Sequence, residues 1–436
     1  MLVFAVSAGQ VRVVPEITAL KFDAVSALVA SAPEETESSD ANDTSELAYT
    51  AGGAPEKIPD DVKKKPEPPP ESENSSLPGP QTEIKPRPAE TREIRAVWIS
   101  YLEFAEILKG KTKAEFLNNI CAYFDNCVDY GLNTVIVQVR SHADALYKSR
   151  YFPVSEYFTV KRSNFLPFDP LEIMVEEAHR RSLRLEAWIN PYRGNRVPSV
   201  FAENDIIEVL LETDNVFEFN GYYYLNPGEP QSRQLIVDGV IEIVENYDVD
   251  GIHFDDYFYP SQSPEIDSAT FNKYGAGKSL AEFRTESVNS LVSTVYKEIK
   301  KRKGIVFGIS PAGNIDNCLR AGADVKLWGS SAGYVDYLAP QLYWDYGQGI
   351  LPYEKALSEW RQTVTAPEVK LLAGLAAYRA GAETSAPYWA SGDVLAHQVT
   401  DARRIPNYNG FMLFRYDHFF DDIRAEERKN LKNILD

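Results

Sequence analysis

The feature that most constrains this fold is a repeated alternation, from about residue 92 onward, of short apolar runs with longer amphipathic segments. The apolar runs that we expect to be strands are 94–100, 134–139, 183–189, 251–255, 305–310, 337–342, 371–375 and 410–414. Helical periodicity is clearest over 113–131, 169–182, 231–248 and 287–303. Eight strands that alternate with helices predict an α/β fold, a (β/α)₈ TIM barrel of parallel strands.

A doubly wound parallel sheet is the alternative to this barrel. Such a sheet usually carries a glycine-rich phosphate loop after its first strand, and the sequence has no such loop there. We therefore prefer the barrel.

Residues 1–92 differ in composition from the rest of the chain. They hold 12 of the 27 prolines, and their central part is rich in Pro, Glu and Ser and nearly free of aromatic residues. A segment of this kind buries too little apolar surface to offset its ordering entropy. We expect a disordered linker, with a merely dispensable tail as the alternative, followed by one barrel domain over 93–436.

The first residues, MLVFAVSA, resemble the end of a signal peptide, because an apolar stretch runs into small residues. A spacer between an export signal and a folded domain is common in wall-associated proteins. We therefore expect an extracytoplasmic protein, secreted or associated with the cell wall.

Composition narrows the choice of partners. The net charge of −19 excludes the basic surface that nucleic-acid binding needs and disfavours docking on anionic lipid. No stretch approaches the roughly 18 apolar residues of a membrane span. Aromatic residues make up 12% of the chain, which is typical of a protein that stacks sugar rings or, alternatively, of one with a large aromatic core. We expect a monomer with a polysaccharide partner.

Metal and acyl-transfer chemistry find little support in the sequence. The three cysteines, Cys121, Cys127 and Cys318, form no CxxC pair, and the five histidines form no HxH or HExxH pattern. The sequence contains no GxSxG elbow. We therefore expect neither a metal site nor a cofactor.

In a barrel of this type the working residues lie at the carboxyl ends of the strands, and strand alternation decides which side chains point inward. In the fourth strand, Ile252 and Phe254 should face the helices. His253 and Asp255 should then face the barrel axis, and Asp256 begins the following loop.

The same alternation predicts a polar rim surrounded by aromatic rings. The side chains that we expect to bind substrate are Gln138, Arg140, Asp144, Trp188, Asn190, Arg193, His253, Tyr257, Ser310, Asn314, Gln341, Tyr343, Trp344 and Tyr378. Trp98, Tyr192 and Tyr259 should add further aromatic rings. Fixed hydrogen-bonding groups and flat rings are what a carbohydrate cleft needs.

Cleavage of a glycosidic bond usually requires two carboxyl groups. Asp255 and Asp256 are the leading catalytic candidates. Alternation separates their side chains, so we expect the second carboxylate to come from another strand. Glu186, Asp345 and Glu103 are the candidates for it.

Each of these acids also has a structural interpretation. A strand-end Asp can cap a helix or pair with Arg95 or Arg140, Glu186 can form a buried ion pair, and Asp144 can order Arg140 rather than react.

Several long stretches carry a family resemblance. They are REIRAVWISYLE at 92–103, NTVIVQVRSHADALYKS at 133–149, AWINPYR at 187–193, the segment 225–260 that ends in GIHFDDYFYP, GISPAGN at 308–314, YVDYLAPQLYW at 334–344 and AGLAAYR at 373–379. With these motifs the chain resembles the glycosyl hydrolase-like 10 family of bacterial envelope proteins. Two departures concern substrate positioning: Glu186 stands where the family often has His, and Phe283-Arg284-Thr285 replaces Trp-Arg-Arg.

The resemblance implies a TIM-barrel glycoside hydrolase whose substrate is bacterial wall glycan, especially peptidoglycan strands stripped of peptides. A glycan-binding barrel of the cell envelope that has lost catalysis is the alternative. A deacetylase acting on the same polymer is a weaker alternative, because it needs a metal site that the histidines do not provide.

Overall fold

The computed structural model describes residues 93–435, except 160, 161, 303, 348, 384 and 385. It also describes the backbone of a short antiparallel pair, β1 (Ala5–Ser7) with β2 (Gln10–Arg12). The predicted signal remnant and linker otherwise lie outside the described residues.

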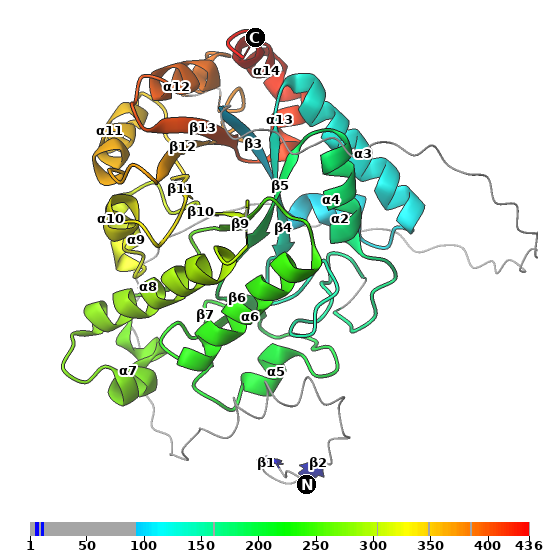
Figure 1. Ribbon diagram of the computed structural model, residues 1–436, viewed down its shortest axis with the longest axis vertical. Helices are drawn as coiled ribbons and strands as arrows, with labels where there is room; N and C mark the ends of the chain where they lie inside the picture. Colours follow the sequence, from blue (N-terminus) through cyan, green and yellow to red (C-terminus); the bar gives the residue numbers. More distant parts are fainter. Residues whose placement is uncertain are drawn as a thin grey trace, which may run out of the picture. The chain divides into compact units, whose positions relative to one another are not determined.

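Eight parallel strands close into a barrel, as the alternation predicts (Figure 1). The strands are β3 (Ile94–Ile99), β4 (Thr134–Arg140), β5 (Arg184–Ile189), β9 (Gly251–Phe254), β10 (Val306–Ile309), β11 (Tyr337–Leu338), β12 (Lys370–Leu375) and β13 (Tyr408–Leu413). They follow one another around the barrel in chain order, and β13 closes it by pairing with β3. The prediction of a TIM barrel is confirmed.

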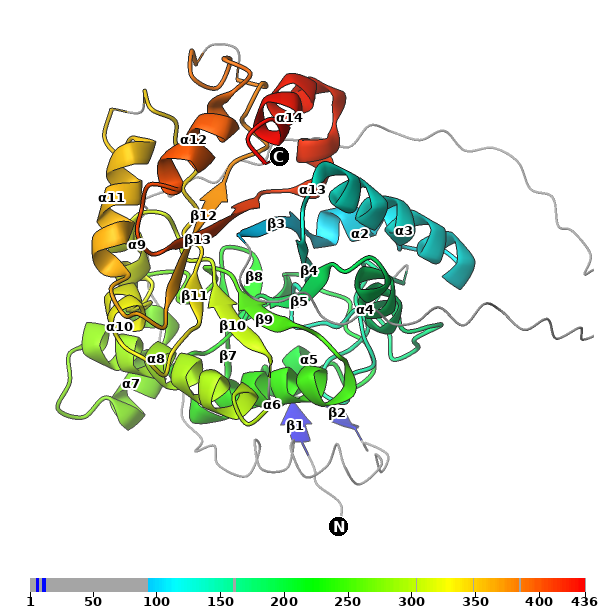
Figure 2. The same cartoon turned by 45° about the horizontal axis from the view of Figure 1, so that its top comes forward.

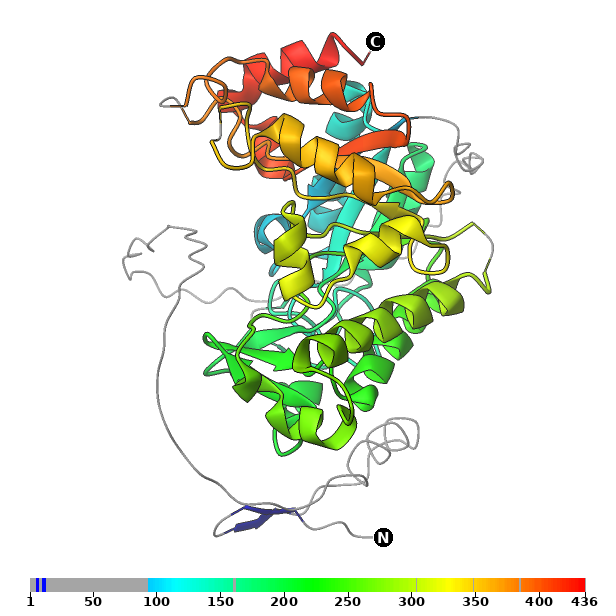
Figure 3. The ribbon, with the colours of Figure 1, turned by 90° about the vertical axis from the view of Figure 1, so that its left-hand side faces the viewer.

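Helices surround the barrel strands in Figure 2. The helices are α2 (Tyr101–Ile107), α3 (Lys113–Tyr130), α4 (Pro170–Arg180), α5 (Ile206–Leu210), α6 (Pro230–Asn246), α7 (Ser268–Tyr274), α8 (Leu280–Ile299), α9 (Ile315–Arg320), α10 (Val325–Ser330), α11 (Tyr353–Thr363), α12 (Val394–Ala402), α13 (Tyr416–Phe420) and α14 (Ala425–Lys432). The described residues also include two single 3-10 turns, η1 (Pro264–Ile266) and η2 (Asp422–Arg424). In Figure 3 the orange and red C-terminal helices cover one side of the barrel and green helices cover the opposite side.

The four predicted helices are confirmed as α3, α4, α6 and α8. Local chemistry explains where they start. Thr112 and Ser279 form capping boxes with Glu115 and Glu282, and Asp169 caps α4. The cap at Ser279 places the start of α8 before the predicted boundary at residue 287. No helix in the described part of the chain is both long enough and apolar enough to span a membrane.

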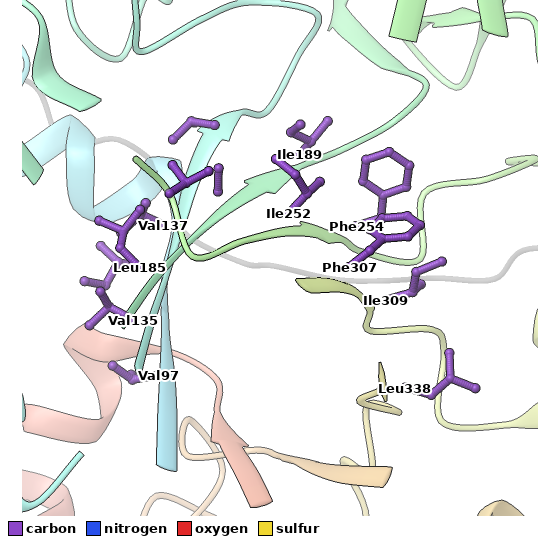
Figure 4. Close-up of a cluster of buried hydrophobic side chains, with 14 of the residues drawn as sticks. Val97, Val135, Val137, Leu185, Ile189, Ile252, Phe254, Phe307, Ile309 and Leu338 are labelled. Carbon is purple, nitrogen blue, oxygen red and sulfur yellow. The ribbon is translucent and has the colours of Figure 1, made fainter. Parts of the chain in front are cut away.

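Strand alternation sorts the core into two regions. Residues that point outward, such as Val135, Val137, Ile252 and Phe254, pack beneath the helices (Figure 4). A separate cluster fills the barrel interior and consists of Ala96, Trp98, Ile136, Trp188, Tyr337, Ala339, Leu372 and Met412. The barrel is therefore a packed core and not a pore, so binding must take place at its ends.

A small antiparallel sheet is inserted after the third barrel strand. It has the order β6 (Arg193–Arg196), β8 (Tyr222–Leu225), β7 (Val216–Phe219). Because β6 begins four residues after β5 ends, the insertion stays beside the carboxyl end of the barrel. The eight-strand prediction contains no counterpart of this sheet.

The interior ring of Tyr337 depends on Gly308 in the neighbouring strand. A Cβ atom at Gly308 would lie 1.8 Å from the Tyr337 ring, so only glycine leaves room for the ring. We expect Gly308→Ala to lower the free energy of unfolding by about 1–3 kcal/mol through overpacking. Urea denaturation followed by circular dichroism measures this. Gly349→Ala is the matched control, because a Cβ atom there meets nothing within 4 Å; equal effects of the two changes would contradict the packing argument.

Candidate functional site

The site is centred on Asp255, the first residue after β9. Its side chain is 3% exposed, and both of its carboxylate oxygens accept hydrogen bonds. Trp188 Nε1 donates to Oδ2 at 3.2 Å, and the backbone N–H of Tyr257 donates to Oδ1 at 3.2 Å. Trp188 comes from the neighbouring strand β5, so the barrel itself sets the position of this carboxylate.

Asp256 is partly exposed and bonds to the side chain of Gln341, which lies just beyond β11. Gln341 also donates from Nε2 to the backbone oxygen of Ser310 at 3.1 Å. Asp256 is therefore tied to the ends of the next two strands, while Asp255 is tied to the preceding one.

The two carboxylates interact electrostatically. Burial raises the pKa of Asp255 well above its usual range, and the charge of Asp256 raises it further. Burial also raises the pKa of Asp256, while Gln341 and Arg193 oppose that rise. Alternation predicts that the two side chains point in different directions. The strand ends at Phe254, however, so its alternation does not extend to Asp256, and the two acids lie close enough to interact.

The candidates for a second carboxylate from another strand are engaged elsewhere. Glu186 lies inside the barrel and accepts a hydrogen bond from Tyr337 Oη at 2.6 Å. Glu103 caps α2 and pairs with Arg415 at 2.5 Å. Asp345 accepts from the backbone N–H of Gly347 at 2.9 Å within its own loop. Within the described residues no hydrogen bond joins any of these three acids to Asp255 or Asp256.

His253 is the centre of a buried hydrogen-bond network below the two acids. Trp98 Nε1 and Ser310 Oγ lie 3.2 and 2.9 Å from its Nε2, and Tyr337 Oη lies 2.7 Å from its Nδ1. Because the indole N–H can only donate, Nε2 accepts and Nδ1 carries the proton. Burial lowers the pKa of His253 to about 3, so the ring stays neutral.

The predicted role of His253 in binding substrate therefore changes. The side chain is fully buried and supports the floor of the site. Ser310 belongs to the same network, and Trp98 fills the barrel interior beside it.

Gln138 and Asn190 form a polar pair at the ends of β4 and β5. Gln138 Nε2 donates to Asn190 Oδ1 at 2.7 Å, and Gln138 Oε1 accepts from the backbone N–H of Tyr101 at 3.0 Å. The amide nitrogen of Asn190 has no hydrogen-bond partner among the described residues.

Strand alternation predicts that Arg140 faces the barrel axis, and this prediction is wrong. A register shift between Gln138 and Arg140 turns its side chain outward. The guanidinium lies 4.5 Å from the centre of the Phe152 ring, beside Gly239 of α6, and it donates to the backbone oxygen of Pro191. Asp144 accepts from the backbone N–H groups of Ser141 and His142, so it orders its own loop.

Two of the predicted rim aromatics are buried in the core. Tyr192 is fully buried and packs against Phe258. Tyr259 is 4% exposed and lies beneath the guanidinium of Arg284. Neither ring is free to stack on a sugar.

A positively charged wall lies on one side of the acids. The Arg193 guanidinium lies 4.8 Å from the Tyr222 ring centre and 4.7 Å from that of Tyr257. His142 and Tyr101 join this wall, with their rings 5.1 Å apart. Sequence reasoning named Arg193 and Tyr257 and missed Tyr222, His142 and Tyr101. The run of three tyrosines at 222–224 was the available signal.

Aromatic rings lie at the ends of later strands. Tyr343 packs against Tyr378 and Phe414, with ring centres 5.8 and 5.7 Å apart. Trp344 covers Gly313, where a Cβ atom would lie 2.6 Å from the indole. The side chain of Asn314 caps α9 by accepting from the Asn317 N–H, and its predicted role in binding substrate stays a prediction.

The chain is similar to a known protein family and to two named relatives. The model of the Glycosyl hydrolase-like 10 family matches residues 93–391. The chain belongs to this family. Glycosyl hydrolase YngK of Bacillus subtilis strain 168 is 34% identical over 354 residues, which cover 74% of this chain and 68% of that protein. Glycosyl hydrolase DigH of Escherichia coli K12 is 32% identical over 327 residues, which cover 67% and 74%.

Solved structures agree on the fold. The catalytic domain of β-amylase from Paenibacillus polymyxa aligns with a TM-score of 0.50 at 11% identity, covering 80% of this chain and all of that domain. Family and fold together support a protein that acts on glycans.

The buried Glu186 predicts a pH-dependent contribution to stability. Burial raises its pKa from 4.5 to about 7, so the folded protein keeps a proton that the unfolded chain loses between these values. Stability from this group therefore falls as the pH rises from 4.5 to 7. We expect Glu186→Gln, which cannot ionise, to gain up to about 3 kcal/mol over wild type in free energy of unfolding between pH 4.5 and pH 8.

Urea titrations across this pH range measure the difference, with exposed Glu106→Gln as the control for loss of one carboxylate. A constant difference between Glu186→Gln and wild type at all pH values would show that Glu186 does not titrate differently in the folded state.

Two substitutions next to Asp255 should shift the pKa of this acid in opposite directions. Asp256→Asn removes a neighbouring negative charge, so the pKa of Asp255 should fall. Trp188→Phe removes a hydrogen bond that favours the ionised form, so the same pKa should rise. Carbon-13 NMR titration of the Asp255 carboxyl measures both changes. An Asp255 pKa that does not respond to Asp256→Asn would mean that the two acids titrate independently.

Proposed function

We propose that this protein is a glycoside hydrolase that acts on bacterial cell-wall glycan. The observation that carries this proposal is the interacting pair Asp255 and Asp256 at the carboxyl end of a barrel strand, where TIM-barrel enzymes place their reacting groups. Two relatives bear the name glycosyl hydrolase, and the family is described as glycosyl hydrolase-like.

The electrostatics of the pair suit acid and base catalysis. Hydrolysis of a glycosidic bond needs one carboxyl group that is protonated and one that is ionised. Two isolated aspartates would both be ionised at neutral pH. Burial and mutual repulsion raise the pKa of Asp255, so the pair can keep one proton between its two members.

The surrounding groups hold this pair in place. Trp188 and the Tyr257 N–H donate to Asp255, and Gln341 bonds to Asp256. Asp256 is the more exposed of the two acids and so the more accessible to a substrate. The amide nitrogen of Asn190, which has no partner among the described residues, is a candidate hydrogen-bond donor to a sugar. The exposed ring of Tyr257 and the partly exposed ring of Tyr343 are candidate stacking faces.

The substrate follows from the family resemblance, which implies wall glycan whose peptides have been removed. An extracytoplasmic location is part of the same proposal, because a protein that acts on this polymer would need to reach it. The competing proposal is a barrel that binds the glycan without cleaving it.

Substitution of the acids tests catalysis. We expect Asp255→Asn and Asp256→Asn each to lower the rate of product release from peptide-free wall glycan by at least about 10²-fold, because each removes a proton-transfer group. Asp345→Asn is the matched control, since Asp345 is also buried and lies beyond a barrel strand, accepts a hydrogen bond within its own loop, and has no hydrogen bond to Asp255 or Asp256 among the described residues.

Product analysis by mass spectrometry measures the rates. Equal rates for all three variants and wild type would remove the acids from the mechanism. Binding of the glycan by wild type without release of any product would favour the non-catalytic barrel.

A further inference from the structure

We propose that part of the positively charged wall, namely Arg193 and Tyr222 together with the adjacent Arg196, is a subsite for a carboxylate substituent on the glycan. In peptide-free wall strands this substituent is the lactyl carboxylate of the muramic acid residue. The inference rests on the proposed function and specifies which substrate group the site recognises.

Arg193 is buried, and one of its N–H groups has no hydrogen-bond partner among the described residues. Its side chain is 8% exposed, and the N–H group in question is that of Nε. The guanidinium lies between the rings of Tyr222 and Tyr257. A planar cation held between two rings, with an N–H to spare, is prepared to donate to an anion.

Arg196 brings a second cation to the same place. Its Nε donates to the Tyr222 hydroxyl at 3.0 Å, and Arg193 bonds to the same hydroxyl. The pKa of Tyr222 is lowered overall, because the two guanidinium groups outweigh the effect of burial. The phenol oxygen accepts from both cations, which leaves its own proton free to donate.

The positive charge of this wall is only partly balanced: Arg193 lowers the pKa of Asp255 and of Asp256 through its charge, but neither acid forms an ion pair with it. Burial and the charges of Arg193, Arg162 and Arg196 hold the pKa of His142 well below its usual range, so the imidazole adds no charge. Arg162 has a carboxylate partner in Asp205 at 2.7 Å. In the described part of the chain, Arg193 and Arg196 form no ion pair within 4.0 Å with any carboxylate. In a protein of net charge −19, two guanidinium groups side by side without a contact ion pair among the described residues point to an anionic ligand.

The position of the wall fits a neighbouring sugar. Tyr257 contacts Arg193 with its ring, and its backbone N–H donates to Asp255. One residue thus joins the anion subsite to the acid pair. A sugar bound next to the acids can therefore place a ring substituent against Arg193. When a peptide is attached, the lactyl carboxylate becomes an amide and loses its charge, so this subsite favours strands without peptides.

Calorimetric binding to matched oligosaccharides tests the subsite. The protein carries Asp255→Asn, so that turnover is slowed by at least about 10²-fold during the measurement. Three probes are compared: a peptide-free wall tetrasaccharide, its carboxyl methyl ester, and the N-acetylglucosamine tetramer, which lacks lactyl groups. We expect the carboxylate form to bind at least about tenfold more tightly than the other two, and added KCl should narrow this difference.

Adding Arg193→Gln should abolish the difference between the probes, and Arg193→Lys should restore part of it. Arg320→Gln, an exposed change on α9 that also removes one positive charge, should leave the difference intact. A purely structural role for Arg193 would weaken binding of all three probes equally, and that result would overturn the inference.

Equal affinity for the carboxylate and its methyl ester in the protein with Arg193 intact would also overturn the inference, without depending on how well any Arg193 variant folds. Failure of the proposed hydrolysis gives a different result. In that case wild type releases no product, while the preference for the carboxylate probe persists.

Discussion

The closure of the barrel between its last and first strands is the constraint on which the rest of the molecule depends. β13 pairs with β3, and Gly410 lies opposite Ile94. A Cβ atom at Gly410 would lie 2.1 Å from the Ile94 carbonyl oxygen, so this approach requires glycine. Closure removes both sheet edges and brings the carboxyl ends of all eight strands to one face. Residues separated by more than 200 positions can therefore share a site.

The barrel interior supports this face through polar contacts rather than packing alone. Tyr337 donates to Glu186 and bonds to His253, which in turn accepts from Trp98 and Ser310. A buried polar group is costly without a partner, so each member fixes the orientation of the next. Trp188, one layer nearer the strand ends, then donates to Asp255. The rigid core thereby positions the first acid.

The candidate site combines opposite charges in separate places. Two acids with raised pKa values lie at the end of β9, and two guanidinium groups lie on the inserted strand β6 beside them. Tyr257 separates the two regions while contacting both. This separation lets one surface supply proton transfer and another recognise charge, and it depends on a sheet that is not part of the barrel.

Local sequence patterns were enough to predict the barrel, its eight strands and the place of Asp255 at a strand end, because period-two alternation and strand-end position are local properties. Ile252 and Phe254 face outward as predicted, and Asp255 lies at the strand end. The predicted inward direction of the Arg140 side chain was wrong, because it is set by a register shift that depends on how β4 pairs with β5. The structural positions of His253 and Glu186 were decided by hydrogen-bond partners from other strands and the loops that follow them. The wall of Arg193 and Tyr222 also exists only in three dimensions, since the folding of the inserted sheet brings these residues together.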